Sequence, residues 1–168
     1  RNLQEIYIWG RRHEQAESLA KTLNNELDIR VTAVNDPEKY ANICDIICCA
    51  TFACEPIIKG KWLSCDKSQH FDLVGGYTYY MREADNDIIA SSNIYVDTFS
   101  GALSEAGDIL RPIDEGIMSK DDVLGDLFDM VADDFKQPDN GKNTLFKSVG
   151  TALEDLIAAK LAYAKLSQ

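Results

Sequence analysis

The feature that most constrains the fold is a series of short apolar runs separated by segments with helical spacing. The run at 45–50, DIICCA, is almost continuously apolar, which is typical of a parallel strand covered on both faces. Strands alternating with helices predict an α/β fold with a mostly parallel, doubly wound sheet. The other predicted strands are 6–9, 29–34, 71–74, 93–97 and 143–149.

The predicted helices lie between and after these strands. Residues 13–24 form one, and a short helix near Tyr40 follows the turn at Asp36-Pro37. Residues 119–132 are predicted as a single helix, with Ser119 as its N-cap. A final helix at 151–166 begins with Thr151 and Glu154, the spacing of a capping box. The apolar face predicted for the first helix consists of Ala16, Leu19, Ala20 and Leu23.

Composition narrows the class of protein. The chain has 168 residues and a formal net charge of -11. This charge argues against nucleic acid as a main partner, because phosphate backbones demand a basic surface. No apolar run is long enough to cross a membrane. We therefore expect a globular domain of a cytoplasmic protein.

The five cysteines do not predict a metal site. Four of them fall within CDIICCATFAC, but no paired Cys-x-x-Cys turns occur. In a strand, Cys48 and Cys49 would point to opposite faces. We expect all five to be small buried residues of a reducing compartment, with no bound metal.

Ligands of doubly wound sheets bind beyond the carboxyl ends of the strands. The residues that follow the predicted strands are therefore the candidate ligand contacts. Glycines at two of these positions allow the backbone to approach a flat ligand closely. The candidates are Trp9, Gly10, Arg11, Arg12, Ala50, Thr51, Phe52, Val74, Gly75, Gly76, Ser148 and Val149.

The basic corner Gly10-Arg11-Arg12 indicates which dinucleotide is bound. An NAD site usually has Asp or Glu here to bind the ribose 2′-hydroxyl, and no carboxylate lies between Trp9, at the end of the predicted strand, and Glu14. Arginine binds phosphate with a flat, two-pronged guanidinium. The pattern favours the 2′-phosphate of NADP(H), while NAD(H) stays possible. The alternative is a pair of solvated arginines offset by Glu14 and Glu17.

Four segments resemble the ornithine cyclodeaminase/mu-crystallin family: CDIICCATFACEPII, FDLVGGYTYYMREAD, YVDTFSGALSEAGDIL and NTLFKSVGTALEDLIAAKLAY. IYIWGRRHEQAESLA fits the second strand and helix of its Rossmann domain. The resemblance implies that residues 1–150 are a partial dinucleotide-binding domain whose first strand and glycine-rich loop lie upstream. It implies that 151–168 pack toward a separate substrate and dimerisation domain, which makes a homodimer.

The resemblance also implies roles for the candidate residues. Arg11 and Arg12 face the adenosine ribose, Thr51 and Phe52 lie along the cofactor, and Ser148 approaches the nicotinamide. Glu105 either faces the substrate or is a surface carboxylate. Cyclodeaminases place a catalytic Asp directly after the glycine pair, where this chain has Tyr77. Tyr77 is a proton donor or an aromatic lining of the pocket.

This departure favours imino-acid reduction, of the ketimine or pyrroline-2-carboxylate type, with an NADP cofactor. Two alternatives remain. One is an ornithine cyclodeaminase that makes proline and ammonia, and the other is a non-enzymatic, NADPH-dependent binder of a small molecule, as in mu-crystallin. A short-chain dehydrogenase is disfavoured, because neither Tyr79 nor Tyr80 has a Lys at the required spacing.

Overall fold

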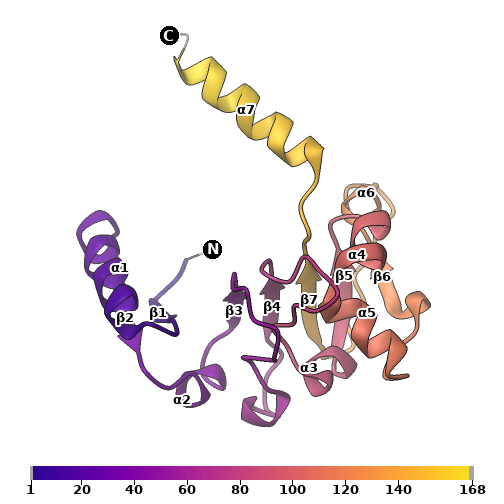
Figure 1. The fold of residues 1–168 in the computed structure, drawn as a ribbon, viewed down its shortest axis with the longest axis horizontal. Coiled ribbons are helices and arrows are strands. Elements are labelled where there is room, and N and C mark those ends of the chain that lie inside the picture. Colours follow the sequence, from indigo (N-terminus) through magenta and orange to yellow (C-terminus); the bar gives the residue numbers. More distant parts are fainter. Residues whose placement is uncertain (1, 167–168) are drawn as a thin grey trace. The chain divides into compact units, whose positions relative to one another are not determined.

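The computed structural model describes residues 2–166. The chain divides into two compact units, Arg1–Cys44 and Asp45–Gln168, which are described separately. Both combine parallel strands with helices (Figure 1). The predicted α/β class is therefore confirmed.

The first unit is a single β-α-β motif followed by a short helix. Strand β1 (Glu5–Trp9) pairs in parallel with β2 (Arg30–Val34), and α1 (His13–Glu26) connects them. Helix α2 (Glu38–Ala41) follows. On α1, only Ala16 and Ala20 are buried. The prediction for Leu19 is wrong, because this side chain is 49% exposed.

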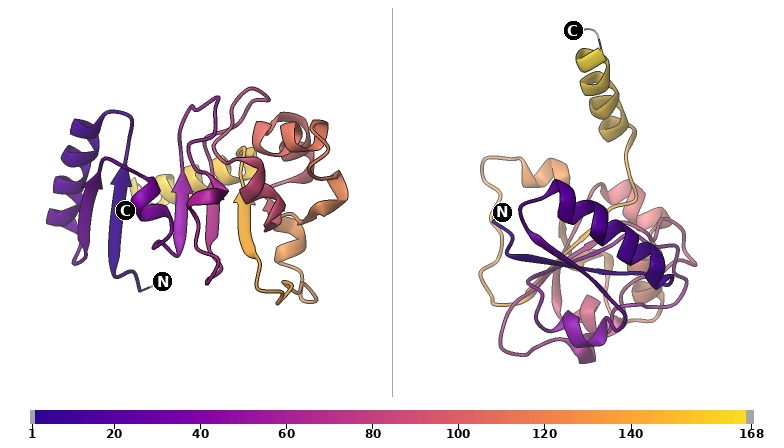
Figure 2. Two further views of the ribbon diagram at one scale, coloured as in Figure 1. Left: turned by 90° about the horizontal axis from the view of Figure 1, so that it is seen from below. Right: turned by 90° about the vertical axis from the view of Figure 1, so that its left-hand side faces the viewer.

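The second unit contains a five-stranded sheet in the order β3-β4-β7-β5-β6. All of its pairings are parallel. Figure 2 shows these strands from two further sides. The strands are β3 (Ile46–Cys49), β4 (His70–Leu73), β5 (Ser92–Val96), β6 (Val123–Gly125) and β7 (Asn143–Lys147).

Helices and single helical turns connect these strands. The connection from β3 to β4 contains only the 3-10 turn η1 (Gly60–Trp62), whereas β5 is followed by two consecutive helices. A second 3-10 turn, η2 (Lys120–Asp122), precedes β6. The α-helices are α3 (Asn86–Ala90), α4 (Phe99–Glu105), α5 (Gly107–Asp114), α6 (Leu127–Met130) and α7 (Ala152–Leu166).

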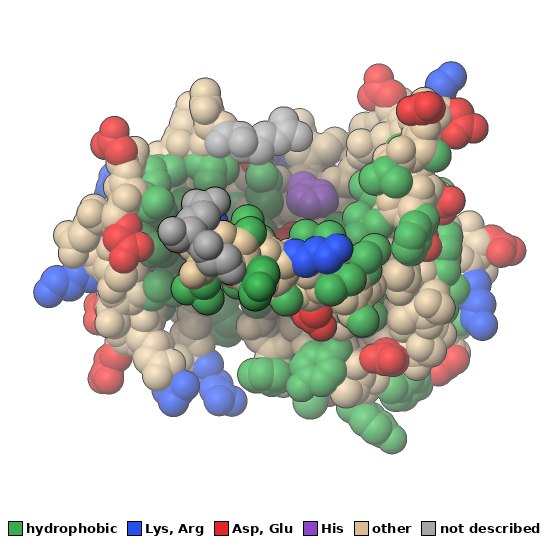
Figure 3. All heavy atoms as spheres, turned by 90° about the horizontal axis from the view of Figure 1, so that it is seen from above, with side chains coloured by type: hydrophobic (Ala, Val, Ile, Leu, Met, Phe, Trp, Pro, Cys, Tyr) green, Lys and Arg blue, Asp and Glu red, His purple; other side chains and the backbone are tan. Residues whose placement is uncertain are grey.

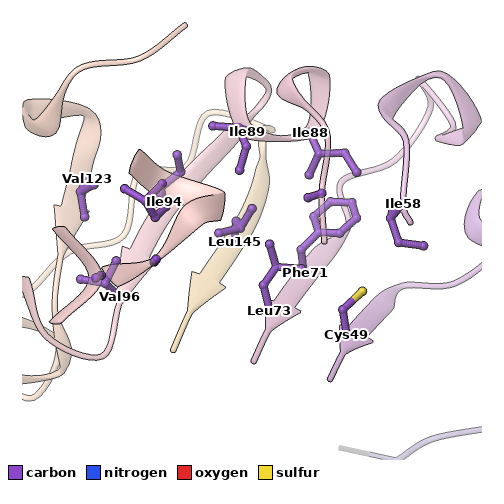
Figure 4. Packing of buried hydrophobic residues seen from close by; sticks show 14 residues of the cluster. Cys49, Ile58, Phe71, Leu73, Ile88, Ile89, Ile94, Val96, Val123 and Leu145 are labelled. Carbon is purple, nitrogen blue, oxygen red and sulfur yellow. The ribbon is translucent and has the colours of Figure 1, made fainter. Parts of the chain in front are cut away.

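The core of the second unit lies between the sheet and the helices α3 to α5. Figure 4 shows Phe71 and Leu73 of β4 beside Leu145 of β7, with Ile88 and Ile89 of α3 above them. These five side chains are at most 1% exposed. Full burial of such a side chain stabilises the fold by about 1.5–3 kcal/mol, so this cluster fixes the register of the central strands.

The prediction of one helix over 119–132 is wrong. The single helix expected over 119–132 is instead η2, β6 and α6. Ser119 does begin a turn, since its N–H donates to Asp122 Oδ2 over 2.7 Å, but the turn ends at once. Asp126 then caps α6 through the N–H groups of Phe128 and Asp129. The two N-caps, Ser119 and Asp126, divide the segment, and β6 lies between them as an outer strand of the sheet.

The cysteines are less buried than expected. Cys49 is buried and Cys44 is partly buried, but Cys48, Cys54 and Cys65 are exposed. Cys48 and Cys49 do point to opposite faces of β3, as the exposure of one and burial of the other require. β3 is an outer strand of its sheet, and Ile46 on this strand is 39% exposed.

Helix α7 follows β7 and has exposed side chains along its whole length. The predicted capping box is confirmed: Thr151 N–H donates to Glu154 Oε2 over 2.9 Å, and Glu154 N–H donates to Thr151 Oγ1 over 3.3 Å. Hydrophobic side chains, drawn in green, gather in the middle of the face shown in Figure 3. Within residues 2–166, no helix is long and apolar enough to cross a membrane.

Candidate functional site

The candidate residues of the first unit lie at the turn from β1 into α1. Trp9 ends β1, Gly10 is partly exposed, and Arg11 and Arg12 are exposed. In the described part of the chain, neither arginine forms an ion pair with an acid. Glu17 pairs with His13 instead, over 3.2 Å. The guanidinium groups therefore remain available to a ligand, at a helix N-terminus whose dipole also attracts anions.

The candidates of the second unit gather at one edge of its sheet. Ala50, Thr51 and Phe52 follow β3, Val74 to Gly76 follow β4, and Ser148 and Val149 follow β7. These strands are consecutive neighbours in the order β3-β4-β7. Their carboxyl ends point to the side from which α7 leaves (Figure 1). The structure thus brings together the three segments that the sequence analysis predicted, one by one, as ligand contacts.

Glu83 joins the first two of these segments. Its side chain is fully buried. Oε1 accepts hydrogen bonds from Thr51 N–H over 2.6 Å and from Thr51 Oγ1 over 2.7 Å, and Oε2 accepts one from Gly75 N–H over 2.8 Å. A Cβ on Gly75 would collide with the Thr51 backbone and with Glu83, so the close approach of the two segments requires glycine here.

Asp97 holds the third segment in the same way. It follows β5 and is fully buried. Its Oδ2 accepts Ser148 Oγ–H over 3.1 Å, Val149 N–H over 2.7 Å and Gly150 N–H over 2.7 Å. Its Oδ1 accepts Thr98 N–H over 2.7 Å. Asp97 therefore accepts four hydrogen bonds, three of them from the segment after β7.

An ion pair lies beneath the glycine pair. Lys147 and Asp108 are both fully buried, and Lys147 Nζ lies 3.7 Å from Asp108 Oδ2. Lys147 also donates to the Leu73 carbonyl over 2.9 Å. Asp108 Oδ1 accepts from the N–H groups of Glu83 and Ala84, and a Cβ on Gly76 would lie 2.6 Å from Oδ2. Burial raises the pKa of Asp108 and lowers the pKa of Lys147, because each loses its hydration.

These four buried residues were not nominated by the sequence reasoning. One signal was present: Lys147 lies within an otherwise apolar strand, NTLFKSV, and lysine is almost never fully buried unless paired. Its partner could not be found this way, because Asp108 is far away in the sequence. In the sequence, Glu83 and Asp97 do not differ from acidic residues of exposed loops. Only the fold places hydrogen-bond donors beside them.

The network determines which hydrogen bonds this edge can offer a ligand. The N–H groups of Thr51, Gly75, Val149 and Gly150 already donate to Glu83 or Asp97. They are not available to a phosphate, which requires donors. The remaining features are hydroxyl lone pairs, flat glycine backbone and exposed apolar side chains. Such a surface fits an uncharged or cationic ring with N–H or O–H donors.

Two aromatic side chains lie beside this edge. Phe52 is 79% exposed and Tyr77 is 45% exposed. Their rings meet edge to face, with centroids 6.2 Å apart. Val74 is also exposed, at 47%. Glu105 ends α4 and is exposed, so its substrate-side role stays a prediction. Among the described residues, no cluster of three potential metal ligands occurs.

The parallel α/β architecture, with its candidate contacts at the carboxyl ends of neighbouring strands, defines a Rossmann-type nucleotide-binding fold. Residues 1–168 match the model of the ornithine cyclodeaminase/mu-crystallin family. The chain belongs to this family.

Several relatives have assigned activities. The chain is 32% identical to a Δ1-pyrroline-2-carboxylate reductase of Colwellia psychrerythraea, covering 99% of this chain and 53% of that protein. It is 33% identical to the ketimine reductase mu-crystallin of Mus musculus, covering 96% and 47%. It thus spans about half the length of these curated relatives.

A solved structure confirms the fold. The chain superimposes on the Δ1-pyrroline-2-carboxylate reductase of Thermococcus litoralis, in complex with NADH and L-proline, with a TM-score of 0.91 and 34% identity. The match covers 98% of this chain and 51% of that one. Both the Rossmann-like class and the family that the sequence motifs indicated are therefore confirmed.

The buried ion pair generates a stability prediction. Lys147→Met leaves Asp108 without its buried cation, and we expect the free energy of unfolding to fall by about 3–5 kcal/mol. Asp108→Asn in the same chain keeps an oxygen for the Glu83 and Ala84 N–H groups, so we expect the double variant to recover part of the loss. Urea denaturation measures both.

The matched control is Lys39→Met. Lys39 pairs with Asp36 over 3.6 Å at the surface, and we expect its replacement to change the stability by less than about 1 kcal/mol. Equal losses from Lys147→Met and Lys39→Met would contradict the structural role of the buried pair.

Proposed function

We propose that the protein is an oxidoreductase that reduces small imino acids with a nicotinamide cofactor, preferably NADP(H). The observation that carries the proposal is the carboxyl edge of β3, β4 and β7, where Glu83 and Asp97 leave acceptors and flat backbone facing outward. This edge suits a nicotinamide ring and its ribose. The names of the reductase relatives point to the same chemistry.

The two ends of a dinucleotide have different requirements, and the chain offers a group for each. Thr51, Phe52, Val74 and Ser148 supply hydroxyl oxygens and apolar contacts for the nicotinamide end. Arg11 and Arg12 supply unpaired cations for the adenosine end. The cofactor supplies the hydride, and the residues of this chain bind and orient it.

The first prediction concerns the choice of cofactor. NADH is bound in the Thermococcus litoralis structure, but here Arg11 and Arg12 favour a 2′-phosphate. Each arginine-phosphate contact is worth about 1.5–3 kcal/mol. We therefore expect Arg11→Ala/Arg12→Ala to weaken NADPH binding by roughly 100-fold or more and NADH binding by less than roughly 10-fold. Calorimetric titration of the full-length protein measures both constants.

Arg30→Ala is the matched control for this prediction. Arg30 pairs with Glu5 at the amino-terminal end of the first unit's strands, away from the basic corner of the turn. We expect its replacement to leave both affinities unchanged. Equal affinity of the wild-type protein for NADPH and NADH would refute the preference.

The reaction type follows from Tyr77. Cyclisation with loss of ammonia needs a group that moves protons on and off two amines. A carboxylate does this near neutral pH, whereas a phenol with a pKa near about 10 does not. Reduction of a protonated imine needs only a hydride and a carboxylate clamp. The presence of Tyr77, where cyclodeaminases carry an Asp, therefore favours reduction.

We expect the full-length protein to oxidise NADPH with Δ1-pyrroline-2-carboxylate or its six-membered analogue, and not to form proline from ornithine with NAD. Spectrophotometric assay of the first and ammonia release in the second measure the two activities. Conversion of ornithine while the imines are ignored would show that another residue moves the protons. Binding of NADPH with neither activity would favour a non-enzymatic binding protein.

Tyr77→Phe separates the two roles of Tyr77 in that assay. Phenylalanine keeps the ring that contacts Phe52 and removes the hydroxyl. We expect kcat to change by less than about 3-fold, because the ring lines the pocket. A fall of about 100-fold or more would instead identify Tyr77 as the proton donor.

We also propose that α7 packs against a substrate and dimerisation domain outside residues 1–168, in a cytoplasmic homodimer. The supporting observation is its exposed apolar face: Leu153, Leu156, Ile157 and Leu161 are 49–59% exposed. Large contiguous apolar surfaces mark interaction sites. A glycine-rich phosphate loop, which the pyrophosphate needs, would belong to the same outside sequence.

The corresponding prediction is that residues 1–168 alone give no turnover and bind NADPH weakly or not at all. The fragment and the full-length protein should be assayed side by side with NADPH and a cyclic imine. Turnover by the fragment comparable to that of the full-length protein would place the active site within residues 1–168. It would contradict the proposal that a domain outside these residues is required for activity.

A further inference from the structure

A cavity lies beside β6, the outer strand at the opposite margin of the sheet from β3 (Figure 1). Its volume is about 250 Å³. Ile89 and Ile94, which are at most 1% exposed, form its buried part, and Ile117 and Leu124, which are 41% and 43% exposed, line it nearer the surface. Sites for whole small molecules usually measure about 300–1,000 Å³. This cavity therefore suits one long side chain better than a complete cofactor.

Two carboxylates, Asp121 and Asp122, line the same cavity, and both residues are exposed. Asp122 Oδ2 accepts Ser119 N–H over 2.7 Å and Ser119 Oγ–H over 3.0 Å. These hydrogen bonds lower the pKa of Asp122, because they favour its charged form. Lys142 also lines the cavity and offsets part of this negative charge. A side chain with an apolar stem and a cationic head would contact both the isoleucine-rich lining and the carboxylates.

The surface around the cavity is strongly acidic. Residues 114–139 contain nine Asp or Glu residues and two Lys residues, and they therefore carry seven of the eleven net negative charges of the chain. Of these nine acids, only Asp126 is buried. Exposed apolar side chains are interspersed with them, such as Phe128 at 64% and Val131 at 80%. Apolar contacts inside a negative field are complementary to a segment that is both basic and amphipathic.

We propose that this margin of the second unit is a docking surface for a basic amphipathic segment of a partner protein, and that an arginine side chain of the segment occupies the cavity. The arginine stem lies against Ile117 and Leu124, and the guanidinium meets Asp121. Arginine fits better than lysine, because its flat head is more weakly hydrated and binds a carboxylate through two parallel hydrogen bonds. Arginine is also enriched among the side chains that contribute most to interfaces.

The same charge argues against two other occupants. A second copy of this chain would present the same acidic stretch, and like charges facing each other weaken association. An anionic membrane or a nucleic acid would be repelled for the same reason. The proposed docking surface is independent of the proposed cofactor and reaction, so its test is independent of the imine assays.

The test uses three short synthetic peptides and the full-length protein. The first peptide has one central arginine among lysines and alanines. In the second, citrulline replaces this arginine, which keeps the stem and removes the charge. In the third, glutamine replaces a terminal lysine, so the second and third peptides have equal net charge. Fluorescence anisotropy measures the three dissociation constants at an ionic strength of about 0.15 M, where the Debye length is about 8 Å.

We expect citrulline to weaken binding by roughly 10-fold or more, because a charged hydrogen-bonded pair is lost. We expect the terminal glutamine to weaken binding by less than roughly 3-fold, because an exposed charge contributes little. Equal losses from the two changes would show a general charge attraction and would overturn the anchoring arginine. Absence of binding of the first peptide would overturn the docking surface itself.

Asp121→Asn tests the contact from the side of the protein. We expect it to weaken binding of the first peptide by roughly 10-fold and to bring the arginine and citrulline peptides closer in affinity. The matched control is Asp133→Asn, which removes an exposed acid of the same stretch that lies outside the cavity lining. We expect a loss of less than roughly 3-fold for this control. Equal losses from Asp121→Asn and Asp133→Asn would contradict the proposal.

Two further variants change the cavity in opposite directions. Ala90 ends α3, is exposed and lines the cavity, so Ala90→Leu fills space that the arginine stem needs, and we expect roughly 10-fold weaker binding. Lys142→Ala removes the competing cation, and we expect roughly 3-fold tighter binding. Unchanged binding to Ala90→Leu would overturn insertion into the cavity. Tighter binding of spermidine than of the first peptide would identify a site for a small cation and would overturn the partner segment.

Discussion

The burial of three carboxylates and one lysine at the carboxyl end of a parallel sheet is the constraint on which the rest of the second unit depends. Isolated charges in such a place would cost several kcal/mol each. Glu83 and Asp97 offset this cost with three and four donated hydrogen bonds, respectively. Those donors come from the segments after β3, β4, β5 and β7. Hydrogen bonds from the loops thus replace the water that would hydrate these carboxylates. The same hydrogen bonds hold the loops in place.

This bracing limits what the second unit can offer to the proposed dinucleotide. The loop N–H groups, which in other nucleotide-binding folds bind phosphate, are here directed inward to Glu83 and Asp97. What faces outward is acceptors, glycine backbone and the rings of Phe52 and Tyr77. The phosphate groups of the proposed ligand therefore need cations from another part of the chain. Arg11 and Arg12 are two such cations.

The sequence predicted the architecture better than the site. Hydrophobic periodicity is local, so strands β1 to β5 and β7 could be placed within a residue or two of their observed bounds. It failed over 119–132, where helical spacing was compatible with two capped turns around a short strand. The strand ends nominated Thr51, Gly75 and Ser148. They did not indicate Glu83, which accepts a hydrogen bond from Thr51, 32 residues away in the sequence. The role of a buried carboxylate depends on the donors that the fold places beside it, and these donors cannot be identified from local sequence.

Asp97 connects this site to the final helix. Its Oδ2 accepts Gly150 N–H, and Gly150 has a φ of 89°, a conformation that favours glycine. The chain turns there and enters α7 at Ala152. One carboxylate therefore fixes both the Ser148 hydroxyl and the direction in which the exposed apolar helix leaves the sheet.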